Sequence, residues 1–552
     1  MQFDEILEEH LGAFGIYQKR IYLLMSTPAI FCGLQLLSPV FTLNIPKHRC
    51  ALPGVSNDTY AVQGLDHEIL LNATIPWKTE KGVSVRDSCL IYKDDVPAGQ
   101  NRTTQECNAW VYDNSVFKNT VVTEFNMVCG TKGLRSLANS ILFAGLLVGS
   151  MVFGIISDVF GRKLSVLIAV LLHLGTGIGT AFAPNYIAFV IIRFFNGASS
   201  ITLFISPFVY VMELVGPSKR TYAGVIIEFF WCFGLLLVGC LAYFIRDWHH
   251  LQLTITAPVV VILGLYWIVP ESPRWLQSRG REKEADTILR IAADVNDVTL
   301  PKKLFDKDTL DDGPQAKITE MFTSPVLIVR TLIIFFNWLV VIMVFYGLAL
   351  NVGDLVGDIF LNFTIGNIME VASNVLVLLL LDRLGRKLLH CGCMLLGGIA
   401  CLCTIFPVLY WNQEHEWITM TLSMIGRFGA SGAFAIIYVF SAELFPTVVR
   451  NSGMGGSSVL GHIGGIISPY IADLVVLVDG DISSALPLIV FGVLTLMAGI
   501  LALWLPETLH RKLPETIEDA KSFGKTTGKR SYHLDHAYDT NIQHDNPAFD
   551  GY

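Results

Sequence analysis

Charged residues are scarce in this sequence. Asp, Glu, Lys and Arg make up 16% of its 552 residues, whereas the apolar set AVILMFWYC makes up 52%. A water-soluble globule of this length needs much more polar surface, so the composition excludes one. The formal net charge of -8 offers no basic surface, and nucleic acid is therefore not an expected partner. We expect most of the chain to lie in a lipid bilayer.

Other motifs that the sequence lacks exclude further classes of function. The sequence has no Gly-x-x-x-x-Gly-Lys-Ser/Thr phosphate loop, so the chain does not supply nucleotide hydrolysis. Its polar segments contain no catalytic constellation, and we expect neither an enzyme, a cofactor nor a metal site. Four cysteines on one apolar stretch are better explained as small packing residues than as metal ligands: Cys391, Cys393, Cys401 and Cys403.

Twelve apolar stretches are each close to the roughly 20 residues that cross a bilayer as a helix. We place them at 21–43, 136–157, 164–183, 187–211, 222–245, 251–269, 327–348, 359–381, 388–410, 417–441, 452–477 and 485–506. The expected fold is an all-α polytopic membrane protein with twelve transmembrane helices. A large loop, 44–135, separates the first two helices, and a linker, 270–326, separates the sixth from the seventh.

The short loops alternate in charge. Basic residues such as Arg162, Lys219 and Arg386 fall on one side, whereas 349–358 and 478–484 carry no Lys or Arg. Because cytoplasmic loops are enriched in Lys and Arg, we expect the linker to be cytoplasmic. We expect both terminal segments, 1–20 and 507–552, to be cytoplasmic as well.

The loop 44–135 is then extracellular, and its contents agree with that side. It holds three N-glycosylation sequons, at Asn57, Asn72 and Asn101. It also holds an even number of cysteines, which suits two disulfide bonds with three alternative pairings: Cys50, Cys89, Cys107 and Cys129.

Charged motifs occur twice, in the same order. Each copy has an Asp, then a Gly-Arg-Lys, then a Glu seven residues before an Arg, and each half ends in Pro-Glu-Ser/Thr. The paired residues are Asp158, Arg162, Glu213 and Arg220 in 21–269, and Asp382, Arg386, Glu443 and Arg450 in 327–506. Such duplication predicts two six-helix halves of a transporter. Within each copy we expect the Asp to pair with the Arg of Gly-Arg-Lys as a latch that breaks when the cytoplasmic side opens. The alternative is that these residues are ordinary interface anchors.

A set of strings in this order resembles the major facilitator superfamily, and within it the organic cation/carnitine/organic anion transporter family. They are EFNMVC (124–129), GIISDVFGRK (154–163), RFFNG (193–197), AYFIRDW (242–248), PESPRWL (270–276), ELFPTVVR (443–450) and LPET (505–508). The resemblance covers residues 15–510. It implies a twelve-helix alternating-access carrier in the plasma membrane that moves small charged organic solutes.

Ionisable side chains inside a span are costly and usually face a wet cavity. Glu370 and His462 lie near the middle of their spans, and Glu228 lies beside Trp231 in another. We expect these four residues and Tyr346 to bind substrate. Carboxylates and aromatic ring faces suit an organic cation, moved by the membrane potential alone. The alternatives are packing roles, with Glu228 hydrogen-bonded to Asn337 or Asn374.

His462 departs from the resemblance. Similar cation carriers have aspartate at this position, and similar anion or carnitine carriers have arginine. A zwitterion or organic anion carrier coupled to an unidentified ion therefore stays open, as does a receptor that has lost transport. Arg193 and Arg427 lie at related places in the two halves and could hold a substrate carboxylate. In carriers that resemble this one, the arginine at the position of Arg193 is commonly structural or coupling-related, so the resemblance implies that role rather than substrate binding.

Overall fold

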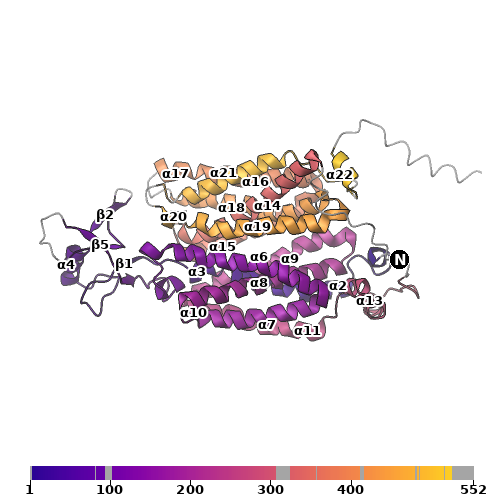
Figure 1. Ribbon diagram of the computed structural model, residues 1–552, viewed down its shortest axis with the longest axis horizontal. Coiled ribbons are helices and arrows are strands. Elements are labelled where there is room, and N and C mark those ends of the chain that lie inside the picture. Colours follow the sequence, from indigo (N-terminus) through magenta and orange to yellow (C-terminus); the bar gives the residue numbers. More distant parts are fainter. Residues whose placement is uncertain are drawn as a thin grey trace, which may run out of the picture.

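Two helical bodies lie side by side in the computed structural model, and a small domain containing strands lies at one end (Figure 1). The structure describes residues 3–80, 83–93, 102–305, 324–355, 357–410, 416–478, 482–483, 485–511, 513–514 and 516–524. In this part of the chain, 11 helices are long and apolar enough to span a membrane, and Leu486–Ala502 is a shorter apolar helix. The predicted twelve-helix membrane fold is confirmed.

The first body contains the first six crossings. They are α2 (Ile16–Leu37) with α3 (Pro39–Thr42), α6 (Gly133–Phe160), α7 (Arg162–Ala181), α8 (Tyr186–Leu214), α9 (Arg220–Phe244), and a sixth crossing in three pieces, α10 (Trp248–Thr256), η4 (Ala257–Gly264) and α11 (Leu265–Ile268). The first helix begins at Ile16 rather than at residue 21, because its first turn is held by the linker: the backbone N–H of Tyr17 donates to the Asn296 side chain at 2.8 Å.

The second body contains the other six. They are α14 (Pro325–Asn351) with η7 (Val352–Asp354), α15 (Ile359–Leu384), α16 (Arg386–Cys403) with α17 (Ile405–Tyr410), α18 (Glu416–Leu444), α19 (Arg450–Ala472) with α20 (Leu474–Leu477), and α21 (Leu486–Ala502). The two bodies meet mainly where α6 packs on α19 and α9 packs on α15.

One glycine in each body makes the turn between two long helices. Gly161 joins α6 to α7 with φ +105°, and Gly385 joins α15 to α16 with φ +88°. Residues with a Cβ rarely adopt this conformation. A Cβ on Gly385 would also lie 2.6 Å from a carboxylate oxygen of Glu507. The turn at the start of each Gly-Arg-Lys motif therefore requires glycine.

The domain between α3 and α6, residues 44–132, is called the disulfide domain below. It has three two-stranded antiparallel sheets: β1 (His48–Cys50) with β6 (Trp110–Tyr112), β2 (Trp77–Glu80) with β3 (Val83–Arg86), and β4 (Leu90–Tyr92) with β5 (Thr104–Glu106). Helices α4 (Leu65–Thr74), α5 (Val121–Glu124) and η2 (Cys129–Thr131) complete it. Asn57 and Asn72 are exposed, and Asn101 lies outside the described residues.

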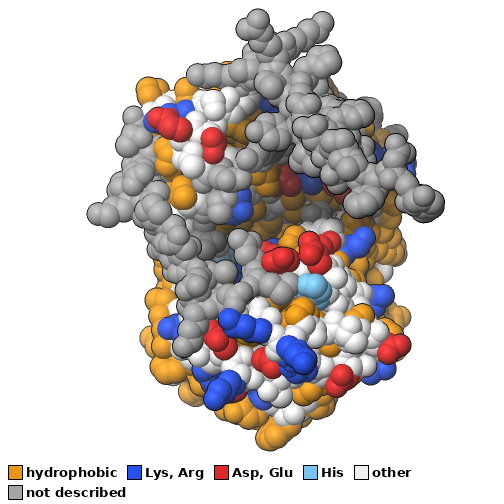
Figure 2. Space-filling model, turned by 90° about the vertical axis from the view of Figure 1, so that its right-hand side faces the viewer, with side chains coloured by type: hydrophobic (Ala, Val, Ile, Leu, Met, Phe, Trp, Pro, Cys, Tyr) orange, Lys and Arg blue, Asp and Glu red, His pale blue; other side chains and the backbone are white. Residues whose placement is uncertain are grey.

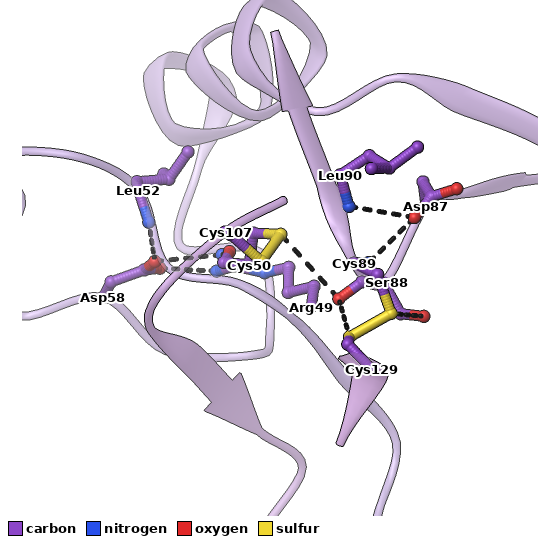
Figure 3. The surroundings of a disulfide bond; sticks show 10 residues. All are labelled: Arg49, Cys50, Leu52, Asp58, Asp87, Ser88, Cys89, Leu90, Cys107 and Cys129. Atoms are coloured by element: carbon purple, nitrogen blue, oxygen red, sulfur yellow. Dashed lines mark hydrogen bonds and ion pairs between the residues drawn. A yellow bond between two sulfur atoms is a disulfide. The ribbon is translucent and has the colours of Figure 1, made fainter. Parts of the chain in front are cut away.

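Two disulfide bonds cross this domain (Figure 3). They join Cys50 to Cys107 and Cys89 to Cys129, one of the three pairings that the sequence allows. Beside the first bond, the Arg49 guanidinium donates to both carboxylate oxygens of Asp58. Small domains with little apolar core depend on such cross-links, typically for about 2–5 kcal/mol.

The opposite end of the helical bodies is called the motif end. The N-terminal helices α1 (Phe3–Glu5) and η1 (Ile6–His10) lie there with α12 (Pro273–Ser278), α13 (Glu282–Asn296) and α22 (Ile517–Ser522) (Figure 1). Phe3, Ile6 and Leu7 share an apolar cluster with Trp275 and Leu289. The N-terminal segment is thus packed onto the linker between the two bodies.

Candidate functional site

The duplicated motif forms a closed polar cluster in the first body. Arg162 reaches Glu213 at 2.8 Å and Asp158 at 2.8 Å. Glu271 accepts the backbone N–H groups of Arg162 and Ser272, and the Ser272 hydroxyl donates to Glu213. Burial raises the pKa of the Glu271 carboxyl group, although these backbone N–H groups act to lower it.

The second body repeats the cluster. Arg386 reaches Glu443 at 3.1 Å and Asp382 at 3.0 Å, and the Thr508 hydroxyl donates to Glu443. Glu507 accepts backbone N–H groups from Arg386 and Thr508. Burial acts to raise the pKa of Glu507, but the backbone N–H groups outweigh it and the pKa is lowered. The Pro-Glu-Ser/Thr repeat is thus part of the same polar unit as Gly-Arg-Lys.

The two Asp–Arg pairs expected to act as a latch are present, and their breaking during transport stays a prediction. The pairs Arg162–Asp158 and Arg386–Asp382 are both formed, yet every described partner lies in the same body as the arginine. Figure 2 looks onto the motif end and shows a hollow between the two bodies, with charged side chains around it. In this structure the pairs therefore join helices within each body and do not join the two bodies.

The last residues of the two motif copies differ in their partners. Arg220 pairs with Asp4 at 2.6 Å, and Asp4 also pairs with Arg274 at 2.9 Å. Its counterpart Arg450 instead donates to the backbone carbonyl of Phe445 at 3.4 Å. The N-terminal segment therefore clamps the motif arginine of one body only. Sequence reasoning missed Asp4, because its position depends on how residues 3–11 pack.

A second polar site lies inside the membrane, where α9 meets α15. Glu370 on α15 is 2% exposed and accepts hydrogen bonds from the Trp231 indole at 3.1 Å and the Cys232 thiol at 3.6 Å. Arg427 on α18 pairs with the same carboxylate at 3.3 Å and also donates to Asn367 at 2.5 Å. The negative charge of Glu370 is therefore already balanced inside the protein.

Glu228 lies one helical turn before Trp231 and Cys232, on the same face of α9. It is half-buried and makes no hydrogen bond or ion pair with any residue that the structure describes. The alternative bonds to two asparagines are not formed, because Asn337 contacts His390 and Asn374 contacts Cys232. Glu228 is thus a carboxylate within a span that has no protein counter-charge.

Tyr346 and His462 lie on other elements. Tyr346 on α14 packs edge-on against Phe143 of α6, with ring centroids 4.8 Å apart. His462 on α19 is 8% exposed and has no hydrogen bond to a described residue. The structure brings Trp231 to Glu370, with Glu228 on the same face of α9. Tyr346 lies where α14 contacts α6, and His462 lies on α19.

The partner of Glu370 was missed, although a repeat signal could have revealed it. In the first body Arg193 donates to Asn139 at 3.1 Å, as Arg427 donates to Asn367. Three residues after Asn139 stands Leu142, where the second body has Glu370. The same arginine–asparagine pair is therefore present twice, but the acid occurs in only one copy.

Among the described residues, one group has metal-ligand atoms close together: His48, Cys89 and Cys129. Both cysteines belong to one disulfide bond, which leaves no thiolate for a metal. Cys391, Cys393 and Cys401 are buried in α16, as expected for packing residues.

Known proteins match this chain over nearly its whole length. A model of the sugar (and other) transporter family matches residues 98–519. The organic cation transporter protein of Drosophila melanogaster is 39% identical over 546 residues, which cover 95% of each chain. The human organic cation/carnitine transporter 2 is 34% identical over 539 residues, which cover 94% of this chain and 93% of that one.

Solved structures agree on the fold. The inward open xylose transporter XylE from E. coli superimposes with a TM-score of 0.61 at 17% identity, over 92% of this chain and 99% of that chain. The family predicted from the motifs is confirmed: the chain belongs to the sugar (and other) transporter family of the major facilitator superfamily, and its relatives there include organic cation and carnitine transporters.

Proposed function

We propose that this protein is a facilitative carrier of small organic cations in the plasma membrane, and that Glu228 is the counter-charge of the bound cation. The observation that carries the proposal is the contrast between two carboxylates. Glu370 is neutralised by Arg427 at 3.3 Å, whereas Glu228 has no described partner. A bound cation would supply the missing charge.

The surroundings of Glu228 suit an amine with apolar substituents. Trp231 follows on the same face of α9, and its ring packs edge-on against Phe204 at a centroid distance of 6.2 Å. A cation over such a ring gains about 0.5–2 kcal/mol, more as water is excluded. The relatives named above as organic cation transporters support this substrate class.

Transport follows from the position of the site between two bodies. Glu228 and Trp231 belong to one body and Glu370 to the other, so a rocking motion would expose them to each side in turn. We place the motif end and both termini in the cytoplasm, by the charge of the loops. A monovalent cation then needs no coupling ion, because the membrane potential supplies about 2.3 kcal/mol per 100 mV.

The experiment compares uptake of a labelled tetraalkylammonium ion by cells that express the wild type, E228Q, E228D or E284Q. Glu284 is an exposed residue of α13 paired with Arg281, so E284Q changes charge away from the site. We expect E228Q to lose at least about 90% of uptake, a difference of roughly 1.4 kcal/mol, with partial recovery in E228D. E284Q should match the wild type. Normal uptake by E228Q at equal surface abundance rejects Glu228 as the counter-charge.

A zwitterion is the second candidate substrate. The Glu370–Arg427 pair sets a carboxylate and a guanidinium side by side, and one relative is named as an organic cation/carnitine transporter. Such a solute has no net charge, so the potential alone would not concentrate it. Labelled carnitine uptake that requires an Na⁺ or proton gradient, with no uptake of the tetraalkylammonium ion, would establish this alternative.

A further inference from the structure

Arg135 ties the two bodies together at the end next to the disulfide domain. It stands in the first turn of α6, in the first body. Its two terminal nitrogens donate to the two carboxylate oxygens of Asp354 at 3.1 Å each, and Asp354 ends η7 of the second body. Asp473, at the end of α19, lies 3.5 Å from the same guanidinium. Such a fork-to-fork pair is among the stronger and more directional polar contacts.

Neighbouring hydroxyl groups extend this contact along α6. Ser136 donates to Asp473 at 2.5 Å, and Ser140 donates to the backbone carbonyl of Ile466 at 2.7 Å. Both bonds cross from the first body to the second. The side chains of Arg135 and Asp473 are only 4% and 6% exposed, so water competes little for these bonds.

At the motif end, the described partners of the motif arginines form no equivalent bond between the bodies. There every ion pair of Arg162, Arg220 and Arg386 stays within one body or reaches the N-terminal segment. Figure 2 shows the hollow between the bodies at that end. The bodies are therefore bonded at one end and separated at the other, which is the arrangement of a carrier whose site faces the motif end.

We infer that Arg135, Asp354 and Asp473 form an outer latch, which closes the path on the side of the disulfide domain and must break in every transport cycle. The latch sets the fraction of carriers that face inward at rest. Its removal shifts the population toward the outward-facing state, because only the inward-facing state contains these bonds. The inference rests on the alternating access proposed above, but not on the identity of the substrate.

Labelling of a cysteine at position 140 measures this population without any substrate. Ser140 is buried between α6 and α19 on the latch side, so S140C becomes accessible from outside only when that side opens. The probe is a membrane-impermeant thiol reagent added to intact cells. Cells expressing the protein with native Ser140 give the background from exposed Cys240.

The variants are made in the S140C background. We expect D354N and D473N, and R135D more strongly, to raise the labelling rate by about tenfold or more. The charge swap R135D/D354R restores the pair and should return the rate to within about threefold of S140C alone. D358N is the control, because Asp358 caps the start of α15 on the same side without touching Arg135.

Two results would overturn the latch. One is an unchanged labelling rate in D354N, D473N and R135D when surface labelling of the disulfide domain shows normal abundance. The other is a charge swap that labels as fast as R135D alone. If the latch variants behave as expected while no cation is taken up, the substrate assignment fails and the latch stands.

Discussion

Trp231 of the first body donates its indole N–H to the Glu370 carboxylate of the second body, over 3.1 Å. This bond crosses between the bodies deep in the helical region, one turn from the unpaired Glu228. A cation held by Glu228 therefore lies beside the contact that must rearrange when the bodies rock. The proposed function would therefore couple binding to movement through the same face of α9.

Separating the two roles of Trp231 gives a direct prediction. W231F keeps a ring and removes the N–H donor, so we expect a lower maximal uptake rate with half-saturation little changed. W231L also removes the ring. The substrate concentration that gives half-maximal uptake should then rise by about 2- to 30-fold, the equivalent of 0.5–2 kcal/mol of cation–π attraction. Concentration series of tetraalkylammonium uptake measure both constants. Identical constants for W231F and W231L would show that the ring of Trp231 does not bind the cation.

Removing Arg427 should destabilise the protein more than removing its counterpart. R427Q leaves the buried Glu370 without its cation, a change that costs about 3–5 kcal/mol in buried pairs. E370Q/R427Q should recover most of the loss, because no buried charge then lacks a partner. R193Q is the matched control, since Arg193 is bonded to Asn139 and has no acid beside it.

Thermal unfolding of the purified protein in detergent checks this ranking. The expected order of melting temperature is wild type, then E370Q/R427Q and R193Q, then R427Q. If the double variant melts no higher than R427Q, the loss comes from packing of the arginine side chain and not from its charge.

The N-terminal clamp predicts a pH dependence. Burial acts to raise the pKa of Asp4, but hydrogen bonds and charge from Arg220 and Arg274 outweigh it and the pKa is lowered. A lowered pKa means that the clamp is fully formed above the ordinary aspartate pKa of about 3.9 and is lost as pH falls through the lower folded value. Docking of residues 3–11 should therefore be constant from about pH 5 to 8.

Hydrogen exchange of residues 3–11 in the purified protein measures the clamp. D4N should exchange faster than the wild type at neutral pH and should lack the additional opening in acid, since no group at position 4 titrates. If hydrogen exchange of residues 3–11 in the wild type becomes steadily faster from pH 8 to pH 5, a group other than Asp4 controls docking.

The duplicated motifs made much of the fold predictable. Two copies of Gly-Arg-Lys with matching acids require two similar bodies, and the structure forms both clusters from those residues. Helical spacing also places Glu228 and Trp231 on one face, because they are three residues apart. The contact of this face with Glu370 needed the packing of α9 on α15, which no local pattern encodes.

Contacts between distant segments could not be predicted in the same way. In the sequence, Arg135 is a basic residue near the end of a span. Its partners Asp354 and Asp473 lie at the ends of η7 and α19, more than 200 residues away. Four cysteines allow three pairings, and only the folded disulfide domain selects Cys50 with Cys107. Contacts between the ends of helices in different bodies depend on how the two bodies are oriented.

The most direct test of the account is uptake into liposomes that contain only the purified protein, with a fixed potential and no Na⁺ or pH gradient. A labelled tetraalkylammonium ion is expected to accumulate by about 50-fold at 100 mV, negative inside, and E228Q should abolish this accumulation. Accumulation that appears only with an ion gradient, or that persists in E228Q, would rule out transport by Glu228 that is driven by the potential alone.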